Sequence, residues 1–369
     1  SVTAPTGSGG TFTYYTYIYG ANGSLYCSSS YVVNVLSGTA GAITAASTSV
    51  CPGATVTINN TTAGTVSYTN GSLAYKWYRW SNLSGSWTDL GVTTAAYSGA
   101  ASTTPGIYYY MRRTYSTSCG ESDNNYWDAY SGPVKVNAVA TGVSAGSNTA
   151  ICNGSSATLS GSATAPSSIL YFDDFSTNAG WTLGTNWAIS SAVASSGCSS
   201  NDPASDYSMT PDNRILGYAI GACYAANMSS TLYATSPIYN LSGYTNVTLS
   251  FQRWLGVEQP AYDHAYIDVF NGTSWVNIYS NPSTIADASW TLTSYDISSY
   301  VNANFRVRFG MGTTDRSVQY CGWNIDDLTI TGTPSVSYSW SGSNIISGGS
   351  TCCPVVAPTT NSTYTMTAT

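Results

Sequence analysis

The chain contains one block of sequence twice, and this repeat limits the possible folds more than any other feature. Residues 31–58 (YVVNVLSGTAGAITAASTSVCPGATVTI) correspond to residues 132–159 (GPVKVNAVATGVSAGSNTAICNGSSATL), so that Cys51 corresponds to Cys152, 101 residues later. In each copy, alternating valines end one module, and a short joint leads to the first strands of the next. A period of this length, made of short alternating strands, is typical of tandem β-sandwich modules.

The composition agrees with a chain made of strands. Of the 369 residues, 43% are apolar and 7% are charged, and the polar remainder is rich in Ser, Thr, Asn and Gly. Thr, Tyr, Val and Trp suit half-buried pleated surfaces, whereas Ser, Gly and Asn suit turns. No long stretch has apolar residues at helical spacing. We therefore predict an all-β chain of tandem Ig-like β-sandwiches.

The charge pattern excludes some classes of function. The net charge is −7, with ten basic residues, so no basic patch is available to neutralise phosphates and nucleic-acid binding is not expected. No apolar run reaches the length of a membrane span. Nine cysteines in a chain rich in Ser, Thr and Asn favour an oxidising setting. We expect an extracellular or cell-surface protein.

The middle copy of the repeat is complete. Residues 41–141 form a full Ig-like module, in which YKWYRW is the central strand that carries a core Trp. Cys51 lies near its start and Cys119 near its late hairpin, and we expect these two to form a disulfide. Residues 1–40 correspond to the C-terminal part of a further module.

The third copy is interrupted by a long insertion. The core Trp of its central strand is Trp340, 188 residues after Cys152, whereas Trp77 follows Cys51 by 26 residues. The excess predicts an inserted domain at residues 170–332, within an incomplete Ig-like module made of residues 142–169 and 333–369. Residues 359–369 (TTNSTYTMTAT) match residues 103–113 (TTPGIYYYMRR).

Three explanations of the incomplete modules remain open. In the first, these residues are an excerpt of a longer tandem-repeat protein. In the second, subunits polymerise and each completes its neighbour's open sheet, because an open edge is a template for strand addition. In the third, the terminal segments form small units of their own.

The insertion resembles the MAM-like jelly-roll family of bacterial secreted proteins, which is close to cleaved-adhesin domains. The motifs that carry this resemblance are FDDF at the start, SPIYNL, LSF, an Asp before the strand HAYIDVF, a Trp after the turn NGTS, and GWNIDDLTI at the end. The flanking modules resemble Ig-like repeats of large bacterial surface adhesins, including those involved in gliding. The chain is therefore expected to carry a jelly-roll β-sandwich inserted in its last Ig-like module.

The resemblance to the jelly-roll family implies a structural calcium ion. The candidate ligands by position are Asp173, Asp174, Asp212, Asp263 and Asp327. Ca²⁺ takes six to eight hard oxygen ligands, which carboxylates from distant loops can supply. The alternative is that these are solvated carboxylates at strand ends.

Catalysis is not expected, and we predict no catalytic residue and no organic cofactor. His264 is the single histidine of the chain, and no nucleophile motif accompanies it. No cysteine spacing suits zinc. Asp326 and Asp327 are neighbours on a strand, so they are expected to face opposite sides and not to act as an acid–base pair.

Carbohydrate binding is the competing hypothesis. Jelly rolls often bind sugars, which stack on exposed aromatic rings. Most Trp residues of the insertion are expected in the core, and Trp181 and Trp187, which lie outside the clearest strands, are the better surface candidates for carbohydrate contact.

The sequence favours an extracellular structural or adhesive stalk or filament of a bacterial surface that displays a jelly-roll recognition domain. Its expected partners are neighbouring modules or copies of itself in a fibre, and surface glycans. The alternative is a carbohydrate-binding region of a larger secreted enzyme. The adhesion target remains open, as does the pairing of Cys27, Cys152, Cys198, Cys223, Cys321, Cys352 and Cys353.

Overall fold

The computed structural model describes residues 10–19, 25–35, 37–66, 72–82, 86–117, 126–208 and 212–369. These residues form strands joined by turns and loops, with a single short 3-10 helix, Ser298–Tyr300. The protein is therefore all-β, as predicted, and its sheets pack as β-sandwiches. No helix in this described part is long and apolar enough to cross a membrane. The chain divides into two compact units, 1–136 and 137–369, and the finer domain boundaries stay a prediction.

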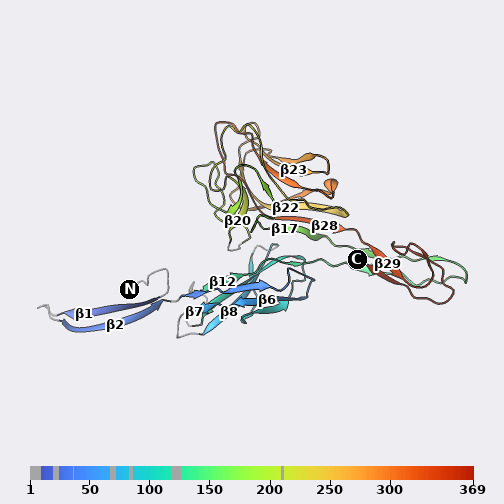
Figure 1. The fold of residues 1–369 in the computed structure, drawn as a ribbon, viewed down its shortest axis with the longest axis horizontal. Helices are drawn as coiled ribbons and strands as arrows, with labels where there is room; N and C mark the ends of the chain where they lie inside the picture. Colours follow the sequence, from blue (N-terminus) through green and yellow to red (C-terminus); the bar gives the residue numbers. More distant parts are fainter. Residues whose placement is uncertain are drawn as a thin grey trace. The chain divides into compact units, whose positions relative to one another are not determined.

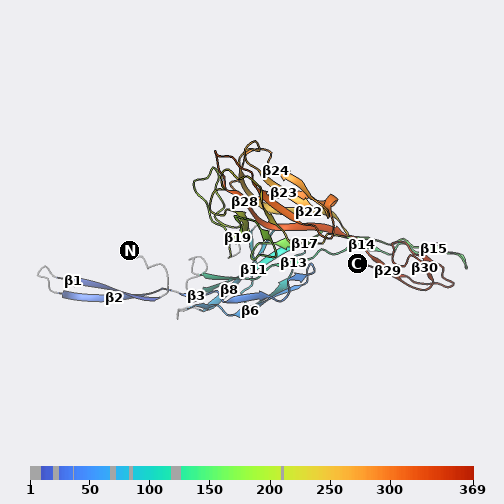
Figure 2. The same cartoon turned by 45° about the horizontal axis from the view of Figure 1, so that its top comes forward.

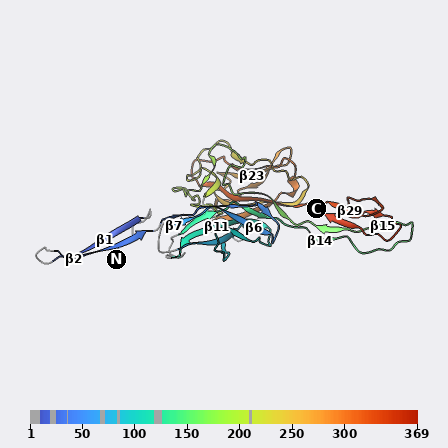
Figure 3. The ribbon, with the colours of Figure 1, turned by 60° about the horizontal axis from the view of Figure 1, so that its bottom comes forward.

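Unit 1 contains a hairpin and a two-sheet sandwich (Figures 1 and 3). One sheet of the sandwich has the order β10-β6-β4, and the other has the order β5-β13-β11-β8-β9, with β12 also paired to β11. The strands of unit 1 are β1 (Gly10–Tyr19), β2 (Leu25–Val35), β3 (Gly38–Thr39), β4 (Ala42–Ala45), β5 (Ser49–Val50), β6 (Thr55–Thr62), β7 (Thr65–Val66), β8 (Leu73–Ser81), β9 (Trp87–Asp89), β10 (Tyr97–Ala100), β11 (Gly106–Ser116), β12 (Tyr126–Tyr130) and β13 (Val134–Val136).

The sequence repeat has a counterpart in strand register. In the β1–β2 hairpin, Gly10 pairs with Val35. In the sandwich, Gly106 of β11 pairs with Val136 of β13. β1 and β2 thus pair in the same register as β11 and β13.

The core of the unit 1 sandwich combines a tryptophan with a buried arginine. Trp77 is fully buried, and its indole N–H donates to the backbone carbonyl of Thr94 (2.8 Å). Arg112, opposite Trp77 on β11, is also fully buried, and its guanidinium donates to Asn60 Oδ1 (2.6 Å) and to the carbonyl of Ala40 (2.8 Å). Burial lowers the pKa of Arg112, and these acceptors offset the cost of burying its charge.

Unit 2 contains the inserted sandwich and a smaller third sandwich (Figure 2). Its strands are β14 (Thr141–Ser144), β15 (Ala157–Thr158), β16 (Ser162–Thr164), β17 (Ser168–Asp173), β18 (Thr182–Leu183), β19 (Trp187–Ser191), β20 (Arg214–Tyr218), β21 (Leu232–Thr235), β22 (Tyr244–Val257), β23 (Ala265–Phe270), β24 (Trp275–Ser280), β25 (Ile285–Ala286), β26 (Thr291–Asp296), β27 (Val307–Met311), β28 (Gly322–Pro334), β29 (Tyr338–Ser341), β30 (Ile345–Ser347), β31 (Val355–Val356) and β32 (Thr365–Ala368).

The inserted sandwich consists of two facing sheets. One has the order β19-β20-β28-β22-β25, with β17 paired to β28 and β26 paired to β22, and the other has the order β18-β21-β27-β23-β24. Its core is rich in aromatic rings, among which Phe309 contacts both Phe251 and Trp323 edge-on, with centroids 5.0 and 5.5 Å apart. Such pairs stabilise a core beyond the area that they bury.

The third sandwich repeats the strand pairs of unit 1. β14 pairs with β16, β15 with β31, and β29 with β32. Trp340 occupies the place of Trp77, since its indole N–H also donates to a backbone carbonyl, that of Thr351 (3.0 Å). Trp340 pairs with Met366, which therefore corresponds to Arg112.

This pairing corrects the alignment made from sequence by two residues. The match of residues 359–369 to residues 103–113 would make Ala368 the counterpart of Arg112, whereas the pairing with Trp340 gives that place to Met366. A two-residue shift keeps each side chain on the same face of the strand, so alternating Thr and Tyr residues cannot distinguish the two alignments. The third sandwich lacks the acceptor of the arginine as well as the arginine. Asn60 of unit 1 corresponds to Gly161, 101 residues later, where a side chain would collide with Met366 and Trp340.

Candidate functional site

A layer of polar side chains is buried on the outer face of the large sheet of the inserted sandwich. Along β28, Trp323 and Ile325 point into the apolar core, whereas Asn324 and Asp326 point to the other face, yet all four are fully buried. Residues 192–208, which follow β19, cover this face as a loop and carry the partners of these polar groups.

Hydrogen bonds fasten the loop to the sheet. Asn324 Nδ2 donates to Asp202 Oδ1 (2.8 Å), and the backbone N–H of Tyr207 donates to Asp326 Oδ2 (2.8 Å). A disulfide joins Cys198 of the loop to Cys223 beyond β20. The polar residues of β28 therefore hold a loop in place, which explains why they are buried.

The alternation of β28 is broken at Asp327. This residue has a left-handed backbone, with φ 49°, and the pairing of β28 with β22 shifts register between Ser250 and Gln252. Asp326 and Asp327 were expected to lie on opposite sides of a regular strand. The bulge instead leaves both carboxyls buried and close enough to interact, because an extra residue in one strand turns its side chains locally.

Asp327 is a buried carboxyl without a hydrogen-bond partner in the described part of the chain. It is 6% exposed, and both of its carboxyl oxygens are buried and accept no hydrogen bond there. Burial raises its pKa well above the usual value, and the carboxylates of Asp174 and Asp206 raise it further, while the nearby Ser208 hydroxyl partly offsets the rise.

The neighbouring Asp326 is better satisfied. It accepts backbone hydrogen bonds from Tyr207 and from Asp327 (both 2.8 Å). Its pKa is also raised well above the usual value, first by burial and then by the charge of Asp327. Asp326 and Asp327, with Asp174 and Asp206 beside them, form a first acidic group. The two buried carboxyls, Asp326 and Asp327, need either protons or a cation, because neighbouring buried carboxylates cannot both be ionised without one.

A second acidic group lies at the ends of three strands. One carboxyl oxygen each of Glu258, Asp263 and Asp315 lies within 4.8 Å of the other two, so this cluster can hold a metal ion. Glu258 follows β22, Asp263 precedes β23 and Asp315 follows β27. Burial and then the charges of Asp263 and Asp315 raise the pKa of Glu258.

The second group is held by well-formed hydrogen bonds. The fully buried Asp263 accepts the hydroxyl of Tyr224 at Oδ2 and the backbone N–H of Asp315 at Oδ1 (2.8 Å). The side-chain amide of Asn281 donates to the backbone carbonyls of Glu258 (2.8 Å) and Asp263 (3.1 Å). These bonds fix Asp263, and the buried Oε2 of Glu258 accepts none in the described residues.

The five predicted ligands do not form one site. Asp174 and Asp327 interact in the first group, and Asp263 belongs to the second. Asp173 is engaged elsewhere, as its oxygens accept the N–H groups of Phe175 (2.9 Å) and Trp181 (2.8 Å). Asp212 is not among the carboxylates that raise the pKa of Asp326 or Asp327.

Sequence reasoning missed four acidic residues of these two groups as ligand candidates: Asp206, Asp326, Glu258 and Asp315. Asp326 had been noted as part of a doublet, but regular alternation placed it away from Asp327. The other three lie in loops without a recognisable motif. The chain has only 17 acidic residues, and this scarcity is the one feature of the sequence that could have drawn attention to them.

The prediction that Trp181 and Trp187 lie at the surface is wrong. They are 4% and 5% exposed and belong to the apolar core. Trp181 donates its indole N–H to Asp173, and Trp187 donates its own to the carbonyl of Leu232 (2.9 Å). Both rings are large enough that burying them outweighs the irregular backbone around them.

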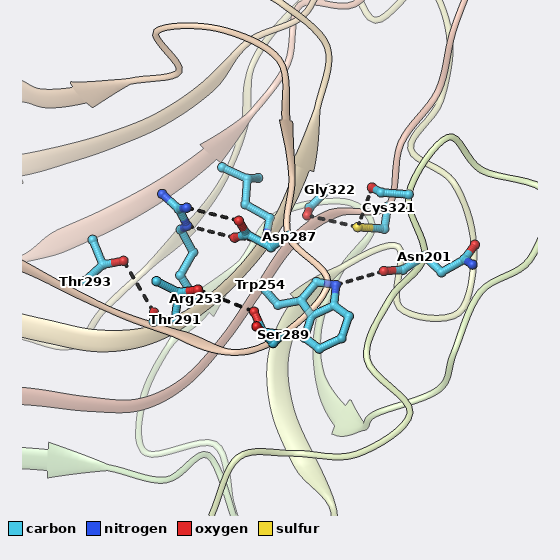
Figure 4. Close-up of polar contacts among 11 residues, drawn as sticks. Asn201, Arg253, Trp254, Asp287, Ser289, Thr291, Thr293, Cys321 and Gly322 are labelled. Carbon is cyan, nitrogen blue, oxygen red and sulfur yellow. Dashed lines mark hydrogen bonds and ion pairs between the residues drawn. The ribbon is translucent and has the colours of Figure 1, made fainter. Parts of the chain in front are cut away.

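Two other tryptophans are half-buried and rigidly held. Trp254 and Trp290 lie edge to face with centroids 5.9 Å apart. Their indole N–H groups donate to the backbone carbonyls of Asn201 (2.8 Å) and Ser205 (3.1 Å) in the covering loop. Figure 4 shows the contact of Trp254 with Asn201 beside the ion pair of Arg253 and Asp287.

The ion pair in Figure 4 supports this region. Arg253 Nε and Nη2 donate to the two carboxylate oxygens of Asp287 (2.9 and 3.2 Å), and the backbone N–H of Leu255 also donates to Asp287 Oδ2 (3.0 Å). A paired, bidentate contact of this kind orients both side chains. It therefore fixes β22 against the segment that leads into β26.

His264 lies beside the second acidic group. Its Nδ1 is 3.1 Å from the carbonyl and from the hydroxyl of Thr313, and its ring stacks on Tyr266. The ring thus contacts a threonine and an aromatic side chain. That the protein has no catalytic activity stays a prediction.

The expected Cys51–Cys119 disulfide cannot be located, since Cys119 lies outside the described residues. Cys51 is exposed and forms no disulfide within them. Cys198 and Cys223 were two of the seven cysteines whose pairing was left open, and they form a disulfide. Cys321 is a buried free thiol near Ser200, and burial raises its pKa to about 12.

Comparison with known proteins gives distant likenesses only. No family model and no curated protein matches the chain. A carbohydrate-binding module of the β-sandwich superfamily is 13% identical over 79% of this chain and 98% of its own, with a TM-score of 0.26. The K3 cleaved adhesin domain of Lys-gingipain from Porphyromonas gingivalis is 15% identical over 44% and 98%, also with 0.26. The C-terminal carbohydrate-binding module of a laminarinase from Zobellia galactanivorans is 14% identical over 44% and 98%, with 0.25. Scores this low assign no function.

Proposed function

We propose that the chain is a structural and adhesive segment of an extracellular bacterial surface protein. In this proposal, tandem Ig-like sandwiches form a stalk, and the MAM-like jelly-roll domain inserted in one of them is displayed sideways as a recognition domain. An insertion between two strands displays a domain without interrupting the string of modules. The chain acts by mechanical resistance and by binding, without catalysis.

The repeated strand register is the observation that carries this proposal. The pair Gly10–Val35 and the pair Gly106–Val136 occupy the same position in two antiparallel strand pairs. Trp77 and Trp340 likewise make the same indole bond to a backbone carbonyl. Repetition of one sandwich along a chain is the design of stalks, in which each module contacts only its neighbours.

A calcium ion bound at the first acidic group would stiffen the displayed domain. Asp327 supports a cation at this place, because its buried carboxyl oxygens accept no hydrogen bond in the described residues. Asp174, Asp206 and Asp327 would supply hard anionic oxygens from a strand end, a loop and a bulge, which suit Ca²⁺ once the ion draws them together. In the described residues, the acidic oxygens that already lie within 4.8 Å of one another are those of the second group, which is the alternative site. Bound calcium would supply the positive charge that lets these carboxyls ionise, and it would tie the covering loop to β28.

The first experiment is imaging of the native material by negative-stain electron microscopy. A stalk predicts linear strings of small modules with heads attached at the side. Compact particles in which the chain is joined to a catalytic domain would contradict it. Glycan panels probed with the full chain, with and without calcium, then identify what the displayed domain binds.

A second candidate function, carbohydrate binding for a secreted enzyme, is favoured by Trp254 and Trp290. Both rings are half-buried, and their orientation is fixed by bonds to Asn201 and Ser205. Aromatic rings held in this way can stack on a sugar at little entropic cost. Quenching of Trp fluorescence by a glycan, lost in Trp254→Ala, together with compact native particles in which the chain is joined to a catalytic domain, would support this function over the stalk.

A further inference from the structure

The third sandwich contains an open groove that is lined by both polar and apolar residues. A cavity of about 640 Å³ lies between residues 145–153, residues 358–364 and the strands beside them. Its apolar lining includes Ile151, Leu159 and Trp340. Leu159 and Ile151 are both half-buried, and so is Val50, the counterpart of Ile151 in unit 1.

The same place is filled in the sandwich of unit 1. Ile58, which stands 101 residues before Leu159, is fully buried there, as is Trp77, the counterpart of Trp340. Both belong to a core cluster that also contains Val134 and Val136 of β13, which are 0% and 1% exposed. The strand β13 therefore closes the groove of that sandwich with two alternate valines.

The backbone beside the groove also differs between the two sandwiches. In unit 1, β11 begins at Gly106, and its first three residues pair with β13, while the third, Tyr108, also pairs with β8 through the other edge of β11. The counterparts of these residues, 360–362, are not part of a strand, and β32 begins only at Thr365. Within the described residues, no strand pairs with residues 360–364. An edge of this kind accepts a further strand.

The strand β2 has the same valine pattern as β13 but is already engaged. Val33 and Val35 correspond to Val134 and Val136. Gly10 pairs with Val35 as Gly106 pairs with Val136. The edge of β2 that corresponds to the paired edge of β13 is therefore already hydrogen-bonded to β1. A strand that meets residues 360–364 through its other edge would turn its valines away from the groove.

We propose that the groove of the third sandwich binds an extended strand that comes from outside residues 1–369. The strand carries branched apolar residues at alternate positions, in the pattern Val-x-Val, and adds antiparallel to residues 360–364. Its two inward side chains fill the cavity against Ile151, Leu159 and Trp340, as Val134 and Val136 do in unit 1. Main-chain hydrogen bonds hold the strand, and the two valines select it.

The inference shares the module repeat with the proposed function, but its test does not depend on calcium or on any glycan. The probe is a labelled peptide with the sequence of residues 131–139 (SGPVKVNAV), titrated into the full chain and followed by fluorescence anisotropy. Hydrogen exchange of the complex is measured in parallel. We expect saturable binding and slower exchange of the backbone amides of residues 361–364.

Matched peptides define the control. A peptide in which Val134→Asp and Val136→Asp are introduced keeps its length and lacks the inward side chains. We expect each substitution to weaken binding by at least about tenfold, since each removes a buried valine. In the chain, Ile151→Lys should weaken binding of the unchanged peptide, whereas Val193→Lys, at an exposed position of the inserted sandwich, should not.

Three results would overturn the proposal. The first is that no peptide binding is found while the chain is folded. The second is that the peptide binds but residues 361–364 exchange as before, which would place it elsewhere. The third is that the chain associates with itself in sedimentation and that Val33→Asp with Val35→Asp abolishes the association, which would identify a second copy as the occupant. If native strings of modules are seen but the peptide does not bind, the proposed function is kept and only this inference is wrong.

Discussion

The indole N–H of Trp181 donates to Oδ2 of Asp173 over 2.8 Å, inside the inserted sandwich. Both residues were assigned functional roles from the sequence, one as a sugar contact and the other as a calcium ligand. The structure instead joins them to each other. Burial raises the pKa of Asp173, and the indole bond is one of two that stabilise its ionised form.

Replacement of Trp181 therefore tests a structural role. We expect Trp181→Phe to lower the free energy of unfolding by about 3 kcal/mol, because it shrinks a core side chain and leaves a buried carboxyl oxygen without its donor. Urea denaturation of the full chain measures the change. Trp254→Phe, at a half-buried ring, is the control and should cost about 1 kcal/mol. A stable Trp181→Phe variant that has lost sugar binding would instead support the prediction from the sequence that Trp181 contacts a sugar.

The first acidic group predicts an unusual dependence of stability on pH in the absence of calcium. The pKa values of Asp326 and Asp327 are raised in the folded state well above the usual value of an aspartate. Their contribution to stability is therefore fully present below that value and is lost as the pH rises through the folded pKa. In EDTA, the melting temperature of the inserted sandwich should fall as the pH is raised from about 4 toward neutrality.

The variant Asp327→Asn separates this effect from other titrations. It removes one of the coupled charges, so the fall in melting temperature should be smaller than in the unsubstituted chain. Asp296→Asn is a control, since that carboxyl is on the surface and its pKa is lowered rather than raised. Equal pH profiles for the chain and for Asp327→Asn would show that Asp327 does not carry the effect.

The disulfide of Cys198 and Cys223 should contribute strongly to the stability of the inserted sandwich. It closes a loop with a sequence separation of 25 residues, and such a crosslink is worth about 3 kcal/mol through the entropy of the unfolded chain. We expect the double variant Cys198→Ser, Cys223→Ser to lose about this amount in chemical denaturation. Cys352→Ser, at an exposed free thiol, should leave the stability unchanged. A loss below about 1 kcal/mol would mean that the loop is held by its hydrogen bonds alone.

The buried Arg112 predicts a large effect in unit 1. Arg112→Met installs the residue found at the corresponding position of the third sandwich, but it leaves Asn60 and the carbonyl of Ala40 without their donor. We expect a loss of about 3 kcal/mol. Lys76→Met removes an ion pair whose partner Asp89 is 46% exposed, and it should cost less than about 1 kcal/mol. Similar losses for the two variants would contradict the role assigned to Arg112.

The sequence predicted the fold better than the site. Alternating strands and the repeat of Cys51 and Cys152 predicted an all-β chain of sandwiches, because strand patterns are local. The carboxyl groups meet only through a loop that crosses a sheet, which no local pattern reports. Asp206 is distant from Asp327 in sequence and contributes to its environment only after folding.

The errors have physical causes. Trp181 and Trp187 lie at irregular places in the chain, yet the size of their rings draws them into the core. Regular alternation placed Asp326 and Asp327 on opposite faces, whereas a bulge at Asp327, whose φ is 49°, breaks that alternation. Bulges are not visible in a pattern of apolar and polar residues.

The most direct test of the account is the melting temperature of the full chain at neutral pH in EDTA and in calcium. At a calcium concentration about a hundredfold above its dissociation constant, binding adds about 2.7 kcal/mol, which should raise the transition of the inserted sandwich by roughly 5–10 °C. Asp327→Asn should abolish this rise, and Glu258→Gln should leave it unchanged. An identical melting temperature with and without calcium, or a rise that survives Asp327→Asn and disappears in Glu258→Gln, would contradict a calcium-stabilised domain built around Asp327.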